Sequence, residues 1–261
     1  MSARILAIVN QKGGVGKTTT TVNLAASLAA AKRCVLLVDM DPQGNATMAS
    51  GVDKRTSRPT VYEVLLGECT ALQAVVRSST GGYDLISANR ELAGAEVELV
   101  DLERREARLK DALSASLDGY DFVLLDCPPA LNLLTVNALV AAHAVLIPMQ
   151  CEYYALEGLS DLVATIKRVR EHLNPTLSID GLLRTMYDPR NTLAQQVSRD
   201  LMRHFGEKVY RTIVPRNIRL AEAPSYGMPV LGLDKRSKGA LAYLALAGEM
   251  LSRAERTEEA V

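Results

Sequence analysis

Short apolar runs alternate along this chain with longer segments in which apolar residues recur at helical spacing. Five runs are rich in leucine or β-branched residues and each precedes a turn: Ile5–Val9, Val35–Val38, Phe122–Leu125, Ala144–Ile147 and Ile179–Leu183. The third run is apolar on both faces, as a strand covered by helices on each side requires. The alternation predicts an α/β fold, with a mostly parallel, twisted sheet and helices on both faces.

The length and the apolar content fit one domain. The chain has 261 residues, of which 48% are hydrophobic, so we expect a single domain over residues 1–261 with a polar C-terminal tail at about residues 253–261. No run of about 18 uncharged apolar residues occurs, and no signal-peptide pattern precedes the first strand. These features predict a cytoplasmic protein.

The charges balance overall but not locally. Thirty basic and thirty acidic residues give no net charge, whereas residues 184–238 hold eleven Lys or Arg and five Asp or Glu. This local excess suggests a basic surface in the C-terminal third.

The first strand leads into a glycine-rich segment, residues 10–19, that is followed by helical spacing. Glycines allow several backbone N–H groups to point at one phosphate, and the start of the next helix adds its positive end. Lys17 is placed to neutralise the β and γ phosphates, and Thr18 to bind Mg²⁺. The alternative is a turn that merely joins a strand to a helix. We predict a phosphate site formed by Lys12, Gly13, Gly14, Val15, Gly16, Lys17, Thr18 and Thr19.

This loop departs from the ordinary phosphate-loop pattern. The position of the first glycine is Gln11, and the loop carries a second lysine, Lys12. Because Lys12 lies five residues before Lys17, it cannot easily reach the same phosphates from the same side. A role for Lys12 toward a second subunit resolves this.

The stretch Lys12–Thr18 resembles the signature of the deviant Walker A ATPases, which include ParA, MinD, the arsenical-pump ATPase and the nitrogenase iron protein. The resemblance implies that Lys12 reaches across a sandwich dimer to the partner's ATP. It therefore implies an ATP-dependent homodimer and an ATPase in which Lys12 and Lys17 act on the phosphates.

Two carboxylates, Asp39 and Asp41, end the second strand, where α/β sheets bind ligands. The resemblance assigns Asp41 to the attacking water and leaves Asp39 to support the loop or the surroundings of the metal. The alternative for Asp41 is a turn or helix-capping residue before Pro42.

A further acid, Asp126, ends the apolar run that begins at Phe122. An acid at this position can hold Mg²⁺ through a bound water, opposite Thr18. We predict Thr18 and Asp126 as the metal-site residues.

Two other segments, 148–158 and 214–224, resemble the chromosomal ParA or Soj branch. The resemblance places Met186, Pro215 and Asn217 beside the adenine, and suggests that Tyr153 and Tyr154 are packing or dimer-surface residues rather than stacking platforms.

The basic residues of the C-terminal third are dispersed, without a helix-turn-helix, a zinc finger or an aromatic stacking motif. They favour sequence-independent contact with DNA phosphates over base reading. The resemblance adds a ParB-type partner that stimulates slow hydrolysis, and hence a nucleoid-associated protein that segregates chromosome or plasmid DNA. The candidate DNA contacts, in order, are Arg219, Arg216, Arg190, Lys235 and Lys238.

Three other functions fit the sequence less well. A MinD-like ATPase needs a basic amphipathic C-terminal helix with bulky anchors, whereas this chain ends in an acidic segment without aromatics. A reductase-type iron protein needs cysteines that bind an iron–sulfur cluster, whereas we expect Cys127 and Cys151 to be core residues. A small-molecule kinase or ligase needs a substrate pocket with its own charged clamp, and the segments that resemble ParA leave little room for one.

Overall fold

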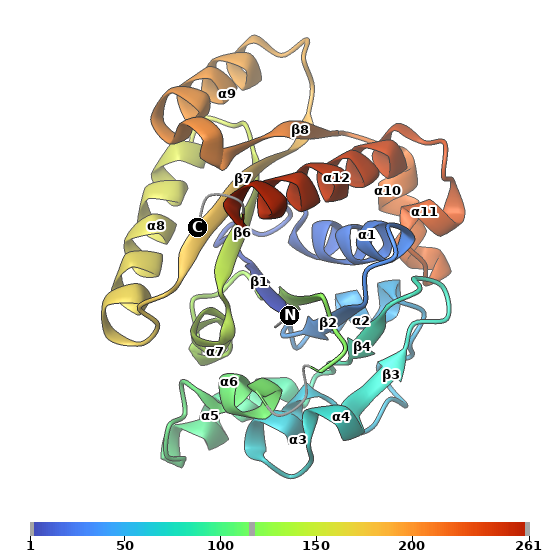
Figure 1. Cartoon of the computed structure of the whole chain (residues 1–261), viewed down its shortest axis with the longest axis vertical. Coiled ribbons are helices and arrows are strands. Elements are labelled where there is room, and N and C mark those ends of the chain that lie inside the picture. Colours follow the sequence, from blue (N-terminus) through green and yellow to red (C-terminus); the bar gives the residue numbers. More distant parts are fainter. Residues whose placement is uncertain (1–2, 115–117, 259–261) are drawn as a thin grey trace.

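A computed structural model describes residues 3–114 and 118–258 of the chain, which contain one eight-stranded sheet (Figure 1). The strand order is β3-β4-β2-β5-β1-β6-β7-β8, and every neighbouring pair is parallel except β3 and β4. The strands are β1 (Arg4–Ile8), β2 (Val35–Asp39), β3 (Val75–Arg77), β4 (Asp84–Ile86), β5 (Phe122–Asp126), β6 (Ala144–Gln150), β7 (Ser178–Tyr187) and β8 (Val209–Pro215).

Helices cover both faces of the sheet, and the sheet separates the core into two apolar clusters. Alternate residues of each strand face opposite sides, so Ile5 and Ala7 join one apolar cluster while Leu6 and Ile8 join the other. The first cluster packs under α3 (Val61–Leu66), α5 (Leu92–Glu98), α6 (Arg108–Ser114), α7 (Leu133–Ala141), α8 (Ala155–His172) and α9 (Thr192–Phe205). The second packs under α1 (Lys17–Ala30), α2 (Asn45–Ala49), α10 (Ile218–Glu222), α11 (Val230–Leu233) and α12 (Lys238–Glu258).

Short helices complete the connections between these elements. They are α4 (Ala71–Ala74) and the 3₁₀ turns η1 (Leu99–Asp101), η2 (Gly206–Lys208) and η3 (Ala223–Tyr226). Within the described residues no helix is both long and apolar enough to cross a bilayer.

The predicted α/β class and the five predicted strands are confirmed. Three strands were not predicted, because β3 and β4 are only three residues long and β8 interleaves Arg211 and Thr212 with its apolar residues. The central position of β1, between β5 and β6, brings the loop after β1 to the middle of the sheet's carboxyl edge. That edge is where parallel sheets bind ligands.

The last helix, α12, continues into the segment expected as a polar tail. It runs to Glu258, and residues 259–261 lie outside the described part of the chain. Arg253 donates to the Val209 carbonyl at 3.2 Å and to Glu249 at 2.8 Å, and its guanidinium lies 4.0 Å from the centre of the Tyr210 ring. These contacts fasten the end of α12 to β8.

Candidate nucleotide site

The loop between β1 and α1 has the backbone of an anion cradle. Gly14 and Gly16 have φ angles of 75° and 90°, a region that side chains with a Cβ rarely adopt. A Cβ at Gly13 or Gly14 would meet no atom within 4 Å, so the loop surface is open there. Gly16 precedes α1 without any side-chain cap, which leaves the first N–H groups of the helix available to an anion.

Lys17 supplies a buried positive charge at this loop. The residue is 7% exposed, and its Nζ donates to the Lys12 carbonyl at 3.2 Å. Burial lowers the pKa of Lys17, while the charge of Asp126 opposes that shift. An ammonium group held this way can exchange a single carbonyl for the oxygens of a phosphate.

Asp126 and Asp39 form a buried acidic pair at the ends of adjacent strands. They are direct partners in the register of β2 and β5, and both are fully buried. Burial, and then the charge of Asp39, raises the pKa of Asp126 to about 8, and burial raises the pKa of Asp39 to about 6. Asp126 accepts hydrogen bonds from Thr18 Oγ1 at 2.8 Å and Thr21 Oγ1 at 2.9 Å.

This set of groups suits a hard divalent cation that keeps waters and phosphate oxygens as ligands. Asp39, Asp41 and Asp126 are all buried, and the charges of Asp126 and Asp41 act on Lys17. Within this described set, acidic groups outnumber the basic group. Among the described residues, no three acidic, His or Cys side chains form a metal cage. Mg²⁺ is usually bound by few protein ligands, and the Thr18 hydroxyl and the Asp126 carboxylate are suitable ligands of this kind.

Asp39 organises the segment that carries Asp41. Its Oδ1 accepts from the Asp41 N–H at 3.1 Å, and its Oδ2 accepts from the Thr47 N–H at 2.8 Å and the Thr47 hydroxyl at 2.7 Å. Asp41 is 9% exposed, and its Oδ1 accepts from the Gln43 N–H at 2.9 Å. One oxygen of Asp41 therefore stabilises the turn at Pro42, as expected if Asp41 were a turn residue. The other oxygen has no hydrogen bond among the described residues.

Lys12 is directed at its own subunit. Its Nζ forms an ion pair with Glu152, which follows β6, and both side chains are half exposed. The neighbouring Tyr153 and Tyr154 are 73% and 72% exposed, and their rings meet edge to face with centroids 5.0 Å apart. The two tyrosines thus pack on each other at the surface and not in the core of this subunit.

The three residues expected beside adenine lie at the ends of β7 and β8. Tyr187 pairs with Pro215, and Met186 lies next to the phosphate loop, with its Cε 3.9 Å from where a Cβ on Gly16 would stand. Asn217 uses its Oδ1 to cap α10, accepting from the Leu220 N–H at 3.3 Å. The contact with adenine remains a prediction for all three.

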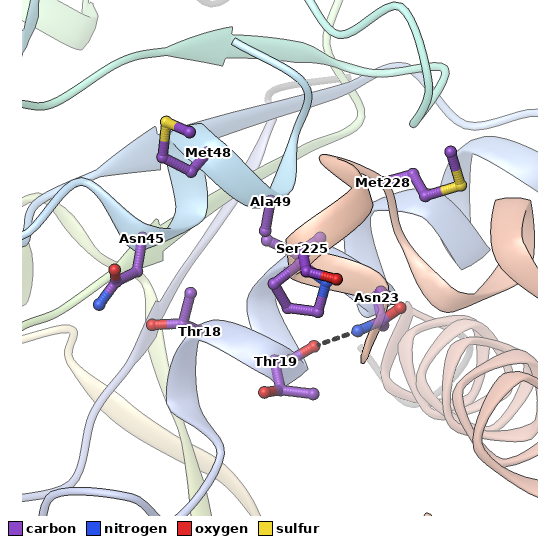
Figure 2. Close-up of a pocket in the computed structure, with 11 residues that line it drawn as sticks. Thr18, Thr19, Asn23, Asn45, Met48, Ala49, Ser225 and Met228 are labelled. Carbon is purple, nitrogen blue, oxygen red and sulfur yellow. Dashed lines mark hydrogen bonds between the residues drawn. The ribbon is translucent and has the colours of Figure 1, made fainter. Parts of the chain in front are cut away.

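A pocket of about 420 Å³ lies beside the phosphate loop, between α1, α2 and η3 (Figure 2). Its lining includes Thr18 and Thr19 of the predicted site but none of the loop glycines. Its apolar side includes Met48 on α2 and Met228 after η3. The pocket thus borders the metal side of the site and is separate from the cradle itself.

Comparison with known proteins decides the family. A family model described as an AAA domain matches residues 3–179. The chain is 52% identical to the chromosome partitioning protein ParA of Caulobacter vibrioides, over 98% of this chain and 97% of that protein. It is 51% identical to the sporulation initiation inhibitor protein Soj of Bacillus subtilis, over 95% and 98% of the two chains. The chain belongs to the ParA/Soj family.

A solved structure shares the whole fold of this ParA/Soj family member. Cobyrinic acid a,c-diamide synthase from Mycobacterium smegmatis, with bound ADP and magnesium, superposes with a TM-score of 0.85 at 40% identity. The match covers 97% of this chain and 96% of that one. The two proteins therefore share one fold over nearly the whole length of each chain.

The candidate DNA contacts of this ParA/Soj family member fall into two groups, those with an ion pair and those without one. Arg190 pairs with Asp188 at 2.8 Å, and Arg219 pairs with Glu222 at 2.8 Å and Asp234 at 3.7 Å. The other candidates are exposed and form no ion pair among the described residues: Arg216, Lys235 and Lys238.

Three residues of the site were not found from the sequence. Thr21 lies one helical turn after Thr18, so the spacing could have placed its hydroxyl beside the same carboxylate. Glu152, just after β6, and Thr185, on β7, contact loop residues that are 140 and 170 positions away along the chain. Their contacts depend on strand order, which the apolar pattern does not specify.

Proposed function

We propose that this ParA/Soj family member is a Mg²⁺-dependent ATPase for DNA partitioning. ATP binding drives a sandwich homodimer that holds duplex DNA without sequence preference, and a ParB-type partner stimulates slow hydrolysis and releases the DNA. The protein would act in the cytoplasm on the nucleoid, segregating chromosome or plasmid DNA. The main support for the proposal is that buried Lys17 and Asp126 and partly buried Thr18 meet at the uncapped start of α1. The loop before them carries a second lysine.

The residues present would hold a nucleotide with its metal. Lys17 would leave the Lys12 carbonyl for the β and γ phosphates, while backbone N–H groups from Gly13 to Thr19 surround them. The Thr18 hydroxyl, now on Asp126, would bind Mg²⁺, with Asp126 holding a water ligand. When bound, Mg²⁺ neutralises charge on the phosphates. The bound metal would also offset the repulsion within the Asp39 and Asp126 pair.

Asp41 would orient the water that attacks the γ phosphate. Its position is fixed from behind by Asp39 and by the turn to Gln43, which leaves one carboxylate oxygen for the water. Asp41→Ala should bind ATP near the normal affinity and lower turnover at least about 100-fold. Phosphate release under saturating Mg²⁺ and ATP is the measurement, with the exposed Asp53→Ala as control. A normal rate in Asp41→Ala would remove Asp41 from this role.

Dimerisation would require Lys12 to exchange one acidic partner for another. In the single subunit its ammonium is on Glu152, an exposed pair of the kind that contributes little to stability. The partner's ATP phosphates carry more negative charge than one carboxylate, which favours the exchange when ATP is bound.

DNA binding would rest mainly on the cations without ion pairs. Arg216 follows β8, and α12 begins against α10, where a Cβ on Gly239 would lie 2.6 Å from Leu220. Arg216, Lys235 and Lys238 are thus near the carboxyl edge that also carries the phosphate loop. The joint variant Lys235→Ala and Lys238→Ala should weaken DNA binding and reduce its salt dependence.

A control separates this surface from overall charge. Lys32 and Arg33, after α1, are exposed and form no ion pair among the described residues. The joint variant Lys32→Ala and Arg33→Ala removes the same charge, and it should bind DNA like the wild type. Equal losses in the two joint variants would contradict a specific surface.

A MinD-like membrane role has less support. A membrane helix must offer its apolar face to lipid, and on α12 Leu246, Ala247 and Met250 are at most 1% exposed because they fill the core.

A further inference from the structure

The phosphate loop is held from outside by the end of β7. Thr185 Oγ1 donates a hydrogen bond to the Val15 carbonyl at 2.8 Å, joining residues 170 positions apart. Thr185 is 2% exposed and Val15 is 1% exposed, so water does not compete for this bond. Among the described residues, it is the one side-chain hydrogen bond between β7 and the loop.

The orientation of one peptide unit depends on this bond. The Val15 carbonyl and the Gly16 N–H belong to the same planar trans peptide, so they point in opposite directions. A hydroxyl that fixes the carbonyl toward β7 therefore turns the Gly16 N–H away from β7. In a glycine-rich anion site, N–H groups converge on the inside and carbonyls lie outside. Thr185 thus holds the loop in the arrangement that phosphate binding needs.

The next residue supports the same wall of the loop. Met186 has a left-handed backbone with φ of 48°, which is uncommon outside glycine and usually persists where the surroundings enforce it. Its side chain lies by Gly16, and its Sδ accepts from Gln150 Nε2 at 2.8 Å. The strand end is therefore fixed on both sides, by β6 and by the loop.

We infer that Thr185 is a positioning residue for ATP binding, acting through the Val15 carbonyl and without touching the nucleotide. The inference rests on the proposed ATP site. If the Val15 carbonyl lost its donor, it would be a buried acceptor without a partner, and the peptide would rotate toward another donor. The Gly16 N–H would then leave the cradle.

Two pairs of variants isolate the hydroxyl. Wild type and Thr185→Val differ in the hydroxyl at constant shape, and Thr185→Ser and Thr185→Ala differ in it at smaller volume. We expect Thr185→Val to weaken binding of a fluorescent ATP analogue about tenfold. Thr185→Ser should stay within about twofold of the wild type, and Thr185→Ala should bind about tenfold more weakly than Thr185→Ser. Should Thr185→Val fail to fold, the Ser and Ala pair gives the same comparison.

A control separates positioning from stability. Ser78 is 1% exposed and donates to the Ser50 carbonyl at 2.8 Å, a similar buried bond outside the loop. Ser78→Ala should lower the melting temperature and leave ATP affinity unchanged. Equal ATP affinity within each hydroxyl pair, in a wild type that binds ATP, would overturn the positioning role alone. Failure of the wild type to bind ATP would overturn the proposed function, and the positioning role with it.

Discussion

At the residue scale, the site keeps a buried acid that opposes folding. Asp126 is fully buried beside Asp39, and its pKa is raised to about 8, above the ordinary value of 3.8. A folded pKa above the unfolded one favours the protonated acid in the fold. The contribution of Asp126 to the stability of the ligand-free protein therefore falls as pH rises from about 4 toward 8.

A neutral amide should relieve this effect. Asp126→Asn should raise the unfolding free energy of the ligand-free protein by on the order of 1 kcal/mol at pH 8, and by less at pH 6. It should also weaken Mg²⁺-dependent ATP binding. Thermal unfolding at the two pH values tests this, and a variant less stable than the wild type at pH 8 would refute it.

Substitution of the two loop lysines should have different effects on ATP binding and on dimerisation. Lys17→Ala removes the buried ammonium and should weaken ATP binding at least about 100-fold. Lys12→Ala removes a half-exposed ammonium paired with Glu152, so it should retain ATP binding and lose the ATP-dependent dimer. Nucleotide titration and light scattering after gel filtration measure both effects. An ATP dimer in Lys12→Ala would contradict action across the interface.

Individual residues of the site also differ in how far their contacts can be predicted from the sequence. Lys17 and Thr18 are one local motif, and Asp126 ends an apolar strand, so their proximity follows from the rule that parallel strands share an edge. Glu152 and Thr185 contact the same loop, but only because β6 and β7 lie in that order beside β1. No local pattern encodes that order.

At the element scale, long apolar strands were predictable and short or amphipathic ones were not. Val35–Asp39 and Phe122–Asp126 are buried throughout, whereas β8 mixes buried, partly buried and exposed residues and lies at the edge of the sheet. The helical course of residues 253–258 depends on packing, since Arg253 is held by Glu249, Val209 and the Tyr210 ring. Its composition alone indicated a polar tail.

The junction of β1 with the turn before β6 should respond to pH. His143 Nδ1 accepts from the Ile5 N–H at 3.0 Å, so the ring must be neutral at that nitrogen. Partial burial, then the charges of Arg4 and Lys110, lowers the pKa of His143 from 6.5. Its stabilising effect is full above about pH 6.5 and is lost as pH falls through the folded pKa.

His143→Asn keeps an acceptor that does not titrate. Relative to the wild type, this variant should therefore lose less stability between pH 7.5 and pH 5. Urea unfolding at both values is the measurement, and parallel losses in the two proteins would exclude a role for the His143 proton.

At the scale of the whole molecule, nucleotide and DNA functions would share one edge. The phosphate loop, Lys12 and the exposed tyrosines follow β1 and β6, while Arg216 follows β8 at the same edge. A dimer joined through Lys12 would double the number of phosphate contacts, so ATP would switch DNA affinity in a chain whose formal net charge is zero.

Binding to random-sequence duplex DNA is the decisive test of an ATP-controlled DNA switch. The wild type and Asp41→Ala are compared with ATP, ADP or no nucleotide, each at several salt concentrations. We expect tight, salt-sensitive binding with ATP alone, and the most persistent binding in Asp41→Ala, because that variant keeps its ATP. Binding that is equal in all three nucleotide states, or absent from all of them, would contradict such a switch.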